Sequence, residues 1–422
     1  MYSSAIFAER LRPYIDALQG SPIPPEMFAG CFNCTIDTTV TPKEDGTLFV
    51  ITGDIPAMWL RDSSAQVMHY VRFADEPDVA DIIKRLLATQ MQCILIDPYA
   101  NSFNQGPNDN HSKLYVDTPA PSAWVWERKY ELDSLCFPLL LSKRFIEKTG
   151  DYSFVTAEYL KALRLITDTV LTETRVESSP YRFQRQDSPD SMPNDGRGLL
   201  LKYTGMSRSA FRPSDDRCEY GYLVPSNLMA LSLLPFVEEL FIRFGDTEYA
   251  KRAGQLKAQI EYGIQNYGIY NHPKYGKIYA YETDGEGNYL LMDDANMPGL
   301  LSLPILGICD INDEIYQNTR RFVLSEDNPF FFRGKYAEGV GSPHTYAGYI
   351  WPIGICSALM TEQDPARQKE LLNMLLTTHG STYRMHESFD PNAPESFSRS
   401  WFAWADSVFA ETVCQLIEKG AC

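Results

Sequence analysis

Apolar residues recur every three or four positions in several long segments, which is the spacing that places them on one face of an α-helix. One such stripe comprises Val155, Tyr159, Leu163, Ile166 and Val170, and another comprises Tyr249, Ala253, Leu256 and Ile260. The same pattern predicts further helices near residues 4–18, 63–73, 77–95, 123–147, 226–244, 296–306, 313–324, 346–361, 364–378 and 397–418. Strand-like alternation is confined to short stretches such as 47–52. A mainly helical protein is therefore expected.

Long polar connections, rich in Gly, Pro, Asn and Asp, separate these helices roughly two at a time. They lie at about 97–122, 176–218, 265–295, 325–345 and 379–396. Loops this long inside a compact domain are usually functional. Helix hairpins arranged in a closed ring would gather the long loops over one mouth. Since neither a fixed-period repeat nor a low-complexity linker divides the chain, we expect one domain over residues 1–422.

Composition and charge narrow the range of partners. Apolar residues make up 44% of the chain and charged residues 22%, which is sufficient for a large core. The formal net charge of −17 would repel nucleic acid and anionic membranes, so neither is expected as a partner. A neutral substrate is more compatible with the negative electrostatic field of the protein. The sequence does not fix an oligomeric state.

Location and redox state follow from the N-terminus and the cysteines. No run of 18 apolar residues occurs, and residues 1–10 lack a signal-like pattern, so we expect a cytoplasmic protein or a processed mature form. Nine scattered cysteines, an odd number, favour reduced thiols. Cys31 and Cys34 form a CxxC pair with no second pair of zinc ligands nearby, so they are interpreted as structural thiols.

Segment 53–64 brings an aromatic residue, an arginine and two acids together directly before an expected helix. Asp62 or Ser63 can cap that helix, and Arg61 paired with an acid would then be structural. In the alternative interpretation Arg61 and Asp62 hydrogen-bond the hydroxyls of a sugar, and Trp59 forms a wall of its site. The residues alone leave both interpretations open.

Segment 121–133 is interpreted as a buried helix whose charged residues form internal ion pairs. Only Trp126 and Glu127, which lie nearest to the preceding loop, are kept as candidates for a functional site.

The adjacent carboxylates Asp215 and Asp216 stand near the end of the longest loop. Stabilisation of a helix N-terminus would explain one of these acids but not both. If the chain after Ser214 is helical, Asp215 and Glu219 are neighbours at i and i+4, and their like charges favour protonation of one of them. A carboxyl that keeps its proton near neutral pH is what a general acid requires.

Glu387 is the candidate for a complementary general base. It lies in the loop before an aromatic-rich segment, and its neighbours His386 and Arg384 would favour the ionised form. An ionised carboxylate beside a wet pocket suits the activation of water.

Two further loops, 292–296 and 341–345, carry polar groups that could line the same mouth. Other catalytic motifs are missing from the sequence, which has no GxSxG, no glycine-rich phosphate loop and no HExxH. Segment 190–196 also misses the spacing of a calcium loop. Of the catalytic mechanisms considered, acid–base chemistry by carboxylates is the one that remains.

Six motifs in this chain resemble glycoside hydrolase family 125. They are GDIPAMWLRDSSAQV, WVWERKYELDSLC, FRPSDD with YGYLVPSN, LMDDANMPGLLSLP, GSPHTYAGYIWP, and MHESFD with WFAWADS. They occur in order from about residue 54 to 409. The resemblance implies an all-α (α/α)6 barrel, a toroid of helix hairpins with long loops over one mouth. It also implies an inverting, exo-acting α-1,6-mannosidase that needs no metal or other cofactor and releases terminal mannose from mannose-containing oligosaccharides.

Carried over residue by residue, the resemblance implies that the acid is one of Asp215 and Asp216 and that the base is Glu387. The expected neighbour Glu219 favours Asp215, and Glu395 is a rival for the base. The residues expected to bind mannose in the innermost subsite are Trp59, Arg61, Asp62, His272, Asn296 and His344.

Two alternatives belong to the same fold. One is a glycosidase of another specificity, such as an α-glucosidase or an endo-acting enzyme, and the other is a sugar-binding protein without catalysis. A blind pocket would favour exo action and an open groove endo action, whereas loss of one carboxylate would mark a non-catalytic protein.

Overall fold

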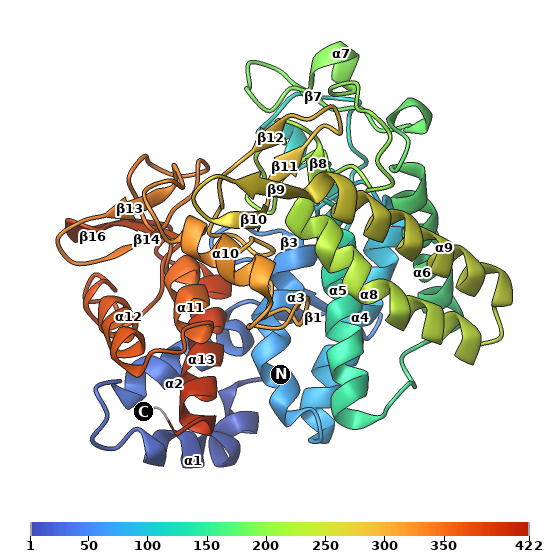
Figure 1. Cartoon of the computed structure of the whole chain (residues 1–422). Helices are drawn as coiled ribbons and strands as arrows, with labels where there is room; N and C mark the ends of the chain where they lie inside the picture. The colour runs from blue at the N-terminus through green and yellow to red at the C-terminus, as the bar shows by residue number, and fades with distance from the viewer. Residues whose placement is uncertain (1, 421–422) are drawn as a thin grey trace.

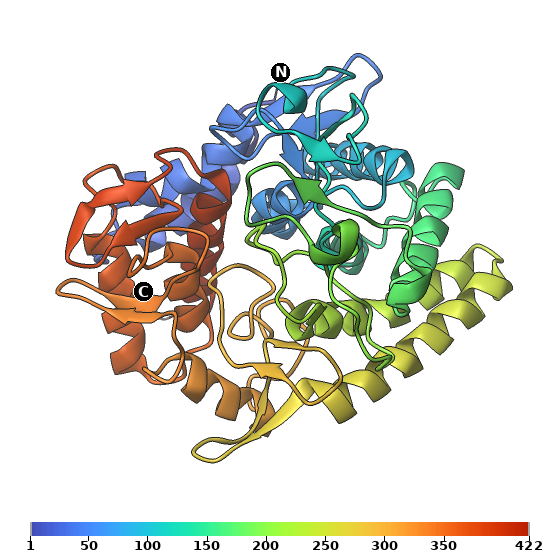
Figure 2. The same ribbon diagram turned by 90° about the horizontal axis from the view of Figure 1, so that it is seen from above.

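The computed structural model describes residues 2–420, and its helices form a closed ring of hairpins in two layers (Figures 1 and 2). The inner helices are α3 (Leu60–Met68), α5 (Leu132–Thr149), α8 (Val224–Arg243), α11 (Pro352–Met360) and α13 (Ala403–Glu418). The outer helices are α2 (Pro25–Thr38), α4 (Pro77–Ile96), α6 (Ala157–Thr172), α9 (Thr247–Gly263), α10 (Glu314–Val323) and α12 (Pro365–Thr377). Helix α1 (Ala8–Ala17) precedes the ring, and α7 (Pro193–Gly196) is a single turn within a loop. The expected toroid of helix hairpins is confirmed.

The inner helices carry much of the buried apolar core. One continuous apolar cluster extends from Phe7 to Leu416 through the inner helices. Helix α8 is long and apolar enough to cross a membrane by length and composition, but most of it is buried inside this fold. Such burial on nearly all sides is typical of a core helix.

Several outer helices begin at a side-chain cap. Thr156, Asp246, Asp313 and Asp364 accept hydrogen bonds from the first turns of α6, α9, α10 and α12. Each cap satisfies a backbone N–H that has no partner within its helix. Gly150 ends α5 in a left-handed conformation with φ 69°. The four side-chain caps and Gly150 thus mark where helices begin or end at short connections. These connections lie at the end of the ring opposite the long loops.

Several expected helices differ from the structure, and one helix was not predicted. The helix predicted over 123–147 begins only at Leu132, because residues 125–127 form a strand instead. The helices predicted over 346–361 and 397–418 begin later, at Pro352 and Ala403. Segment 296–306 forms turns interrupted by Pro298 and Pro304, and it takes the place of an inner helix between α8 and α11 in chain order. Helix α2 was not predicted. Tertiary packing decided these conformations, which apolar periodicity alone does not fix.

The strands are short and lie within the loops that connect the helices. They are β1 (Val40–Pro42), β2 (Leu48–Val50), β3 (Met58–Trp59), β4 (Ser102–Phe103), β5 (Asp117–Thr118), β6 (Val125–Glu127), β7 (Gln184–Arg185), β8 (Tyr222–Leu223), β9 (Ile269–His272), β10 (Gly276–Tyr279), β11 (Glu282–Thr283), β12 (Tyr289–Leu290), β13 (Phe331–Arg333), β14 (Glu338–Val340), β15 (Ser388–Asp390) and β16 (Ala393–Ser398). They form small antiparallel sheets, with β3–β4–β6 and β12–β11–β8 as the three-stranded ones. The long connections gather at the end of the ring that is uppermost in Figure 1.

The ring closes where the two ends of the chain meet. Helix α2 packs on α13, and the backbone N–H of Ala403 donates to the carbonyl oxygen of Thr52 at 3.2 Å. Gly53 forms a bridge with Phe402 at φ 137°, and a Cβ atom there would lie 2.4 Å from the carbonyl oxygen of Trp401. Only glycine allows this close approach.

The eight cysteines in the described part of the chain are free thiols, as the sequence predicted. Cys31 and Cys34 are buried in α2, where the thiol of Cys31 lies 3.2 Å from a carboxylate oxygen of Asp406. They pack the contact between α2 and α13.

Candidate active site

A pocket of about 220 Å³ opens among the long loops at the centre of the ring. Its walls come from both ends of the chain and from the loops between them, and they combine aromatic rings with charged groups. The lining residues are Thr52, Ile55, Trp59, Arg61, Asp62, Pro213, Ser214, Asp215, Asn296, His344, Trp351, Glu387, Arg399, Phe402 and Trp404. The structure thus brings most of the predicted site residues together.

Asp215 stands at the tip of a tight hairpin, residues 211–217. Its φ of 67° is left-handed, which is unfavourable for a residue with a side chain. Three donors approach its Oδ1 atom: Trp59 Nε1 at 3.3 Å, Arg61 at 3.3 Å and Asn101 at 3.2 Å. Within residues 2–420 no side chain donates a hydrogen bond to Oδ2. One oxygen is therefore held by the protein while the other is free to meet a substrate.

The predicted helical pairing of Asp215 with Glu219 is wrong. After Ser214 the chain turns back on itself instead of forming a helix, and Phe211 bridges to Arg217. The backbone of Glu219 donates to Glu282, and the side chain of Glu219 is exposed. The basis on which a raised pKa was expected for Asp215 is therefore absent.

Asp216 is not among the residues that line this pocket. Its Oδ1 atom lies 3.1 Å from Nδ1 of His344, and its Oδ2 atom accepts from Ser214 at 3.3 Å. Burial opposes protonation of His344, but the hydrogen bond and charge of Asp216 raise its pKa to about 9. His344 is thus a cation at neutral pH on the pocket wall, and Asp216 is its partner.

Arg61 lies beneath the pocket as the centre of a buried acidic cluster. Its guanidinium contacts Glu131 at 2.5 Å and Asp133, Asp215 and Asp62 at 3.3 Å each. Its side chain is only 3% exposed. Arg61 lines the pocket, but carboxylates contact all three of its nitrogen atoms, so its role as a clamp for sugar hydroxyls stays a prediction. Its main role is to balance their charge.

Asp62 and Trp404 are buried residues that line the pocket. Asp62 Oδ2 lies 3.3 Å from Nε of Arg61, whereas Trp404 Nε1 has no hydrogen-bond partner among the described residues. Burial raises the pKa of Asp62 to about 6, against the opposing charge of Arg61. A donor without a protein partner at the base of a pocket is suited to bind a hydroxyl group.

The pKa values of the two other carboxyls nearest to Arg61 move apart. Burial raises the pKa of Glu131 well above its usual range, even though Arg61 opposes this effect. Burial also disfavours ionisation of Asp215, but its hydrogen bond with Glu131 and the charges of Arg61 and Lys129 outweigh burial and lower its pKa. These surroundings favour the ionised form of Asp215 and the neutral form of Glu131.

Glu387 precedes β15 and lies in the pocket wall at 7% exposure. Ser398 donates to its Oε2 atom at 2.8 Å, and Arg399 lies 3.6 Å from its Oε1 atom. The predicted partners are wrong, since burial lowers the pKa of His386 and Arg384 pairs with a different acid. Arg399 supplies the positive charge instead.

Three other candidates fall outside the pocket lining. His272 lies on the β9–β10 hairpin, where its ring packs against Tyr275 and Phe322. Glu395 is exposed on β16. Trp126 packs beside Trp59 in a small apolar cluster, and it too is not among the lining residues.

Glu127 belongs to the layer behind the pocket. It accepts a hydrogen bond from Arg185 at 2.9 Å and another from Asn101 at 3.2 Å. Asn296, by contrast, does line the pocket, and its amide donates to Asp294 at 2.7 Å, which fixes its orientation.

Sequence reasoning missed several residues that form the site. Asn101, Lys129 and Glu131 support Asp215 from behind, while Arg399 and Trp404 complete the pocket wall. Lys129, Glu131 and Trp404 lie in motifs that were singled out in the sequence, whereas Asn101 and Arg399 lie outside them. Among the described residues, no three His, Cys, Asp or Glu side chains are arranged to hold a metal ion.

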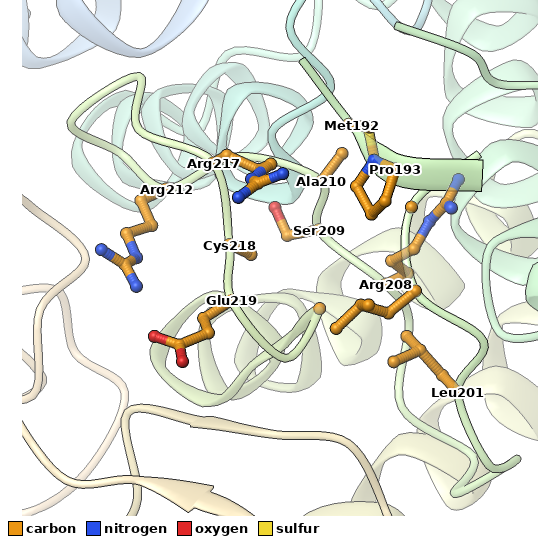
Figure 3. Close-up of a pocket in the computed structure, with 13 residues that line it drawn as sticks. Met192, Pro193, Leu201, Arg208, Ser209, Ala210, Arg212, Arg217, Cys218 and Glu219 are labelled. Carbon is orange, nitrogen blue, oxygen red and sulfur yellow. The ribbon is translucent and has the colours of Figure 1, made fainter. Parts of the chain in front are cut away.

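A second cavity, of about 410 Å³, lies beside the hairpin 211–217 (Figure 3). Arg208 and Arg212 stand at opposite ends of it. Both arginines are already neutralised, by Glu173 at 2.7 Å and by Glu282 at 2.6 Å. Its lining contains no aromatic ring on which a sugar could stack. The carboxylate chemistry is confined to the first pocket.

Known proteins resemble this chain over nearly its whole length. The family described as metal-independent alpha-mannosidase (GH125) matches residues 24–414. A Streptococcus pneumoniae metal-independent alpha mannosidase, solved in a non-productive complex with alpha-1,6-mannobiose, is 43% identical with a TM-score of 0.94 over 99% of both chains. The meiotically up-regulated gene 157 protein of Schizosaccharomyces pombe is 38% identical over 93% of this chain and 82% of its own length. A bacterial glucoamylase shares the fold alone, at 13% identity and a TM-score of 0.58 over 97% of this chain and 59% of its own.

Proposed function

The chain belongs to glycoside hydrolase family 125, the metal-independent α-mannosidases, and on this premise we propose that it releases terminal mannose from α-1,6-mannosides with inversion. The observation that carries this proposal is that Asp215 and Glu387 line one small pocket. The α-1,6 linkage is supported by the Streptococcus pneumoniae relative, which was solved with alpha-1,6-mannobiose.

The shape of the pocket supports exo action. Its volume of about 220 Å³ leaves room for one sugar ring rather than for a run of several. Arg61 and Trp404 line it while being only 2% and 1% exposed, so they form its base. A chain end can enter such a pocket, whereas an internal sugar of a polysaccharide cannot.

The position of the two carboxylates in the ring supports inversion. Asp215 precedes inner helix α8 and Glu387 precedes inner helix α13. The inner ring has six places, occupied in order by α13, α3, α5, α8, segment 297–308 and α11. Helices α8 and α13 are three places apart in this order and therefore lie opposite each other. Inverting glycosidases place acid and base on opposite faces of the sugar, roughly 6.5–9.5 Å apart, which leaves room for a water molecule.

The roles of the two carboxyls follow from their surroundings. Asp215 presents its free Oδ2 to the glycosidic oxygen and donates a proton as the bond from that oxygen to C1 breaks. Glu387 accepts a proton from the water that attacks C1 from the other face, and Ser398 and Arg399 hold it in place. Asp216 is the less suitable acid, because it is bonded to His344 and is not among the lining residues.

Binding of the mannose ring would fall to the groups at the base and wall of the pocket. Trp404 Nε1 has no hydrogen-bond partner among the described residues and can bind a hydroxyl, and the carboxylate of Asp62, which pairs with Arg61, is an acceptor in the pocket lining. His344 offers a charged N–H, and Asn296 an oriented amide. The rings of Trp59 and Trp351 supply apolar walls for the C–H faces of the sugar.

The test is to incubate the protein with α-1,6-, α-1,3- and α-1,2-linked mannobiose and to follow free mannose. We expect the α-1,6-linked disaccharide to be cleaved with the highest kcat/KM. Cleavage of an α-glucobiose in preference to all three would overturn the substrate, and release of internal fragments from a longer mannan would overturn exo action. No cleavage of any substrate by folded protein would favour a non-catalytic sugar-binding protein.

A further inference from the structure

Four carboxyl groups surround one guanidinium below the pocket. The groups are those of Asp62, Glu131, Asp133 and Asp215, and all lie within 2.5–3.3 Å of Arg61. The side chains of Glu131 and Asp133 are fully buried, that of Asp62 is 6% exposed and that of Asp215 is 21% exposed. Water therefore cannot screen most of their mutual repulsion.

This cluster has an excess of negative charge if every group is ionised. Four carboxylates would face a single positive charge at contact distance. The next cation, Lys129, is already shared between Asp190 at 2.9 Å and Glu127 at 3.6 Å, and it reaches Asp215 only through a backbone oxygen. Like charges held this close in a buried site cannot all ionise, so the cluster retains at least one proton near neutral pH.

Glu131 and Asp215 are the two members of the cluster that share the amide of Asn101 as a donor. The amide of Asn101 donates to Glu131 Oε1 at 3.1 Å and to Asp215 Oδ1 at 3.2 Å. Arg61 reaches both acids with its two terminal nitrogens. Burial favours the neutral form of Glu131, which hydrogen-bonds Asp215. Asp133 differs, because its second oxygen accepts from Ser226 at 3.3 Å, on the side of α8.

We propose that Glu131 and Asp215 share a single proton, so that Glu131 is a positioning residue that holds the proton until Asp215 delivers it to the substrate. This inference rests on the proposed function, in which Asp215 is the general acid. It explains how a carboxyl held by three donors, which favour its ionised form, can still act as an acid. Two coupled carboxyls titrate in two separate steps, and the active form is the pair with one proton.

The proton can be followed through one turnover. Before the substrate binds, the proton lies on Glu131. It passes to Asp215 when the glycosidic oxygen stands beside the Asp215 carboxyl, and rotation of that carboxyl about its Cβ–Cγ bond turns the protonated oxygen towards the glycosidic oxygen. As the bond between C1 and that oxygen breaks, the electron pair stays on the oxygen, which takes the proton from Asp215. Water adds to C1 and gives its own proton to Glu387. Loss of that proton to solvent and uptake of one by the pair restore the enzyme.

Other titratable groups face this pair and affect its pH dependence. Asp62 from α3 and Asp133 from α5 add negative charge, and Lys129 adds positive charge behind Asp215. His344 faces Asp215 from the loop after β14, and its pKa of about 9 falls within the alkaline range. The test therefore compares variants that all keep His344.

The experiment measures kcat/KM for Glu131→Gln, with Asp133→Asn as the matched control. Each substitution replaces one buried carboxyl next to Arg61 by an amide, but only Glu131 shares the amide of Asn101 with Asp215. Two substrates are used from about pH 4 to 10: α-1,6-mannobiose, which needs a proton donor, and dinitrophenyl α-mannoside, whose leaving group does not.

We expect Glu131→Gln to lose about 10²-fold or more on mannobiose while it keeps most of its activity on the dinitrophenyl substrate. The alkaline limb of its remaining mannobiose activity should lie at lower pH than in the wild type, because Asp215 alone keeps a proton only in acid. Asp133→Asn should affect both substrates alike. Equal losses on both substrates for Glu131→Gln, or an unmoved alkaline limb, would overturn the proposal.

The variant Glu131→Asp and the activity of the wild type distinguish the remaining outcomes of this experiment. If Glu131→Gln does not fold, Glu131→Asp keeps a titratable carboxyl, and it should retain an alkaline limb while losing activity selectively on mannobiose. An even loss on both substrates would again overturn the shared proton. If the wild type cleaves neither substrate, the proposed function itself fails, whatever the variants do.

Discussion

The ammonium group of Lys129 lies 2.7 Å from the backbone carbonyl oxygen of Asp215. Asp215 has a left-handed backbone, which costs a residue with a side chain about 1–2 kcal/mol. Lys129 is only 5% exposed and also pairs with Asp190 at 2.9 Å, so it ties the hairpin of Asp215 to the loop after β7. The unfavourable conformation that aims Asp215 into the pocket is stabilised by this buried cation.

Replacement of Lys129 by methionine should impair catalysis more than binding. Without the ammonium group, the carbonyl of Asp215 loses its donor and the carboxyl moves relative to the glycosidic oxygen. We expect kcat for mannobiose to fall about 10–100-fold with a small change in KM, because displacement of a catalytic group by about 1 Å has effects of this size. Lys129→Arg is the control that keeps the charge, and it should recover part of the loss. An unchanged kcat with a raised KM would contradict a positioning role.

The two pocket carboxylates should respond differently to removal of their charge. Glu387→Gln should abolish cleavage of every substrate, because no other described residue is placed to activate the water. Asp215→Asn should lose activity on mannobiose but keep much of it on dinitrophenyl α-mannoside, whose leaving group needs little protonation. Asp216→Asn is the matched control, and it should show no such selective recovery. Selective recovery in Asp216→Asn instead would transfer the acid role to that residue.

The stereochemistry of the product gives an independent check on both carboxylates. Water that attacks C1 opposite the departing group converts an α-mannoside into β-mannose. We therefore expect the β-anomer to appear first in rapid proton NMR, before mutarotation mixes the anomers. If α-mannose appears first, the enzyme retains configuration, its carboxyls would be about 5 Å apart, and the roles of Asp215 and Glu387 would be wrong.

Asp62 should make the stability of the fold depend on pH. Its pKa is about 6 in the folded protein, against roughly 3.9 in an unfolded chain. Between these two values the folded state binds more protons, so the free energy of unfolding falls as the pH rises from about 4 to 6. The shift of about two units corresponds to roughly 3 kcal/mol at most. Asp62→Asn should weaken this dependence, which thermal unfolding at several pH values would measure; parallel curves for variant and wild type would refute it.

Gly53→Ala should open the junction at which the ring closes. The added Cβ atom would meet the carbonyl oxygen of Trp401 at 2.4 Å, so the backbone next to Phe402 in the pocket wall must shift. We expect a loss of about 2–4 kcal/mol in the free energy of unfolding and a lower kcat/KM. Gly46→Ala is the matched control, because φ is also positive there but nothing lies within 4 Å of the new atom. Equal destabilisation by both variants would mean that backbone conformation, rather than the close approach, matters at Gly53.

Much of the architecture could be predicted from the sequence because it depends on local patterns. The stripe from Val155 to Val170 became α6, and the stripe from Tyr249 to Ile260 became α9, since each buries one face at the helical period. The long polar segments became the loops around the pocket. The failures occurred where contacts with the long loops decided the conformation, as at residues 123–131, part of which pairs as a strand, and 296–306, which forms turns, because the local pattern there does not distinguish a helix from these alternatives.

The sequence also identified the type of chemistry. A glycosidase that uses carboxylates is indicated by the adjacent acids Asp215 and Asp216, the distant Glu387 and the aromatic residues near them. The motifs that contain these residues resemble one family. The sequence could not separate Asp215 from Asp216, since neighbouring side chains differ in direction only after the hairpin has formed. It also could not show that Arg61 serves buried acids.

Those assignments depend on contacts between residues far apart in the chain. Asn101 and Lys129 reach Asp215 across 114 and 86 positions, and Arg399 reaches Glu387 only through the β15–β16 hairpin. Local propensity therefore determined the helices and the types of reacting groups. Only the closed ring decided which carboxyl faces the pocket and where the protons lie, because burial and the distances between charges exist only in the folded chain.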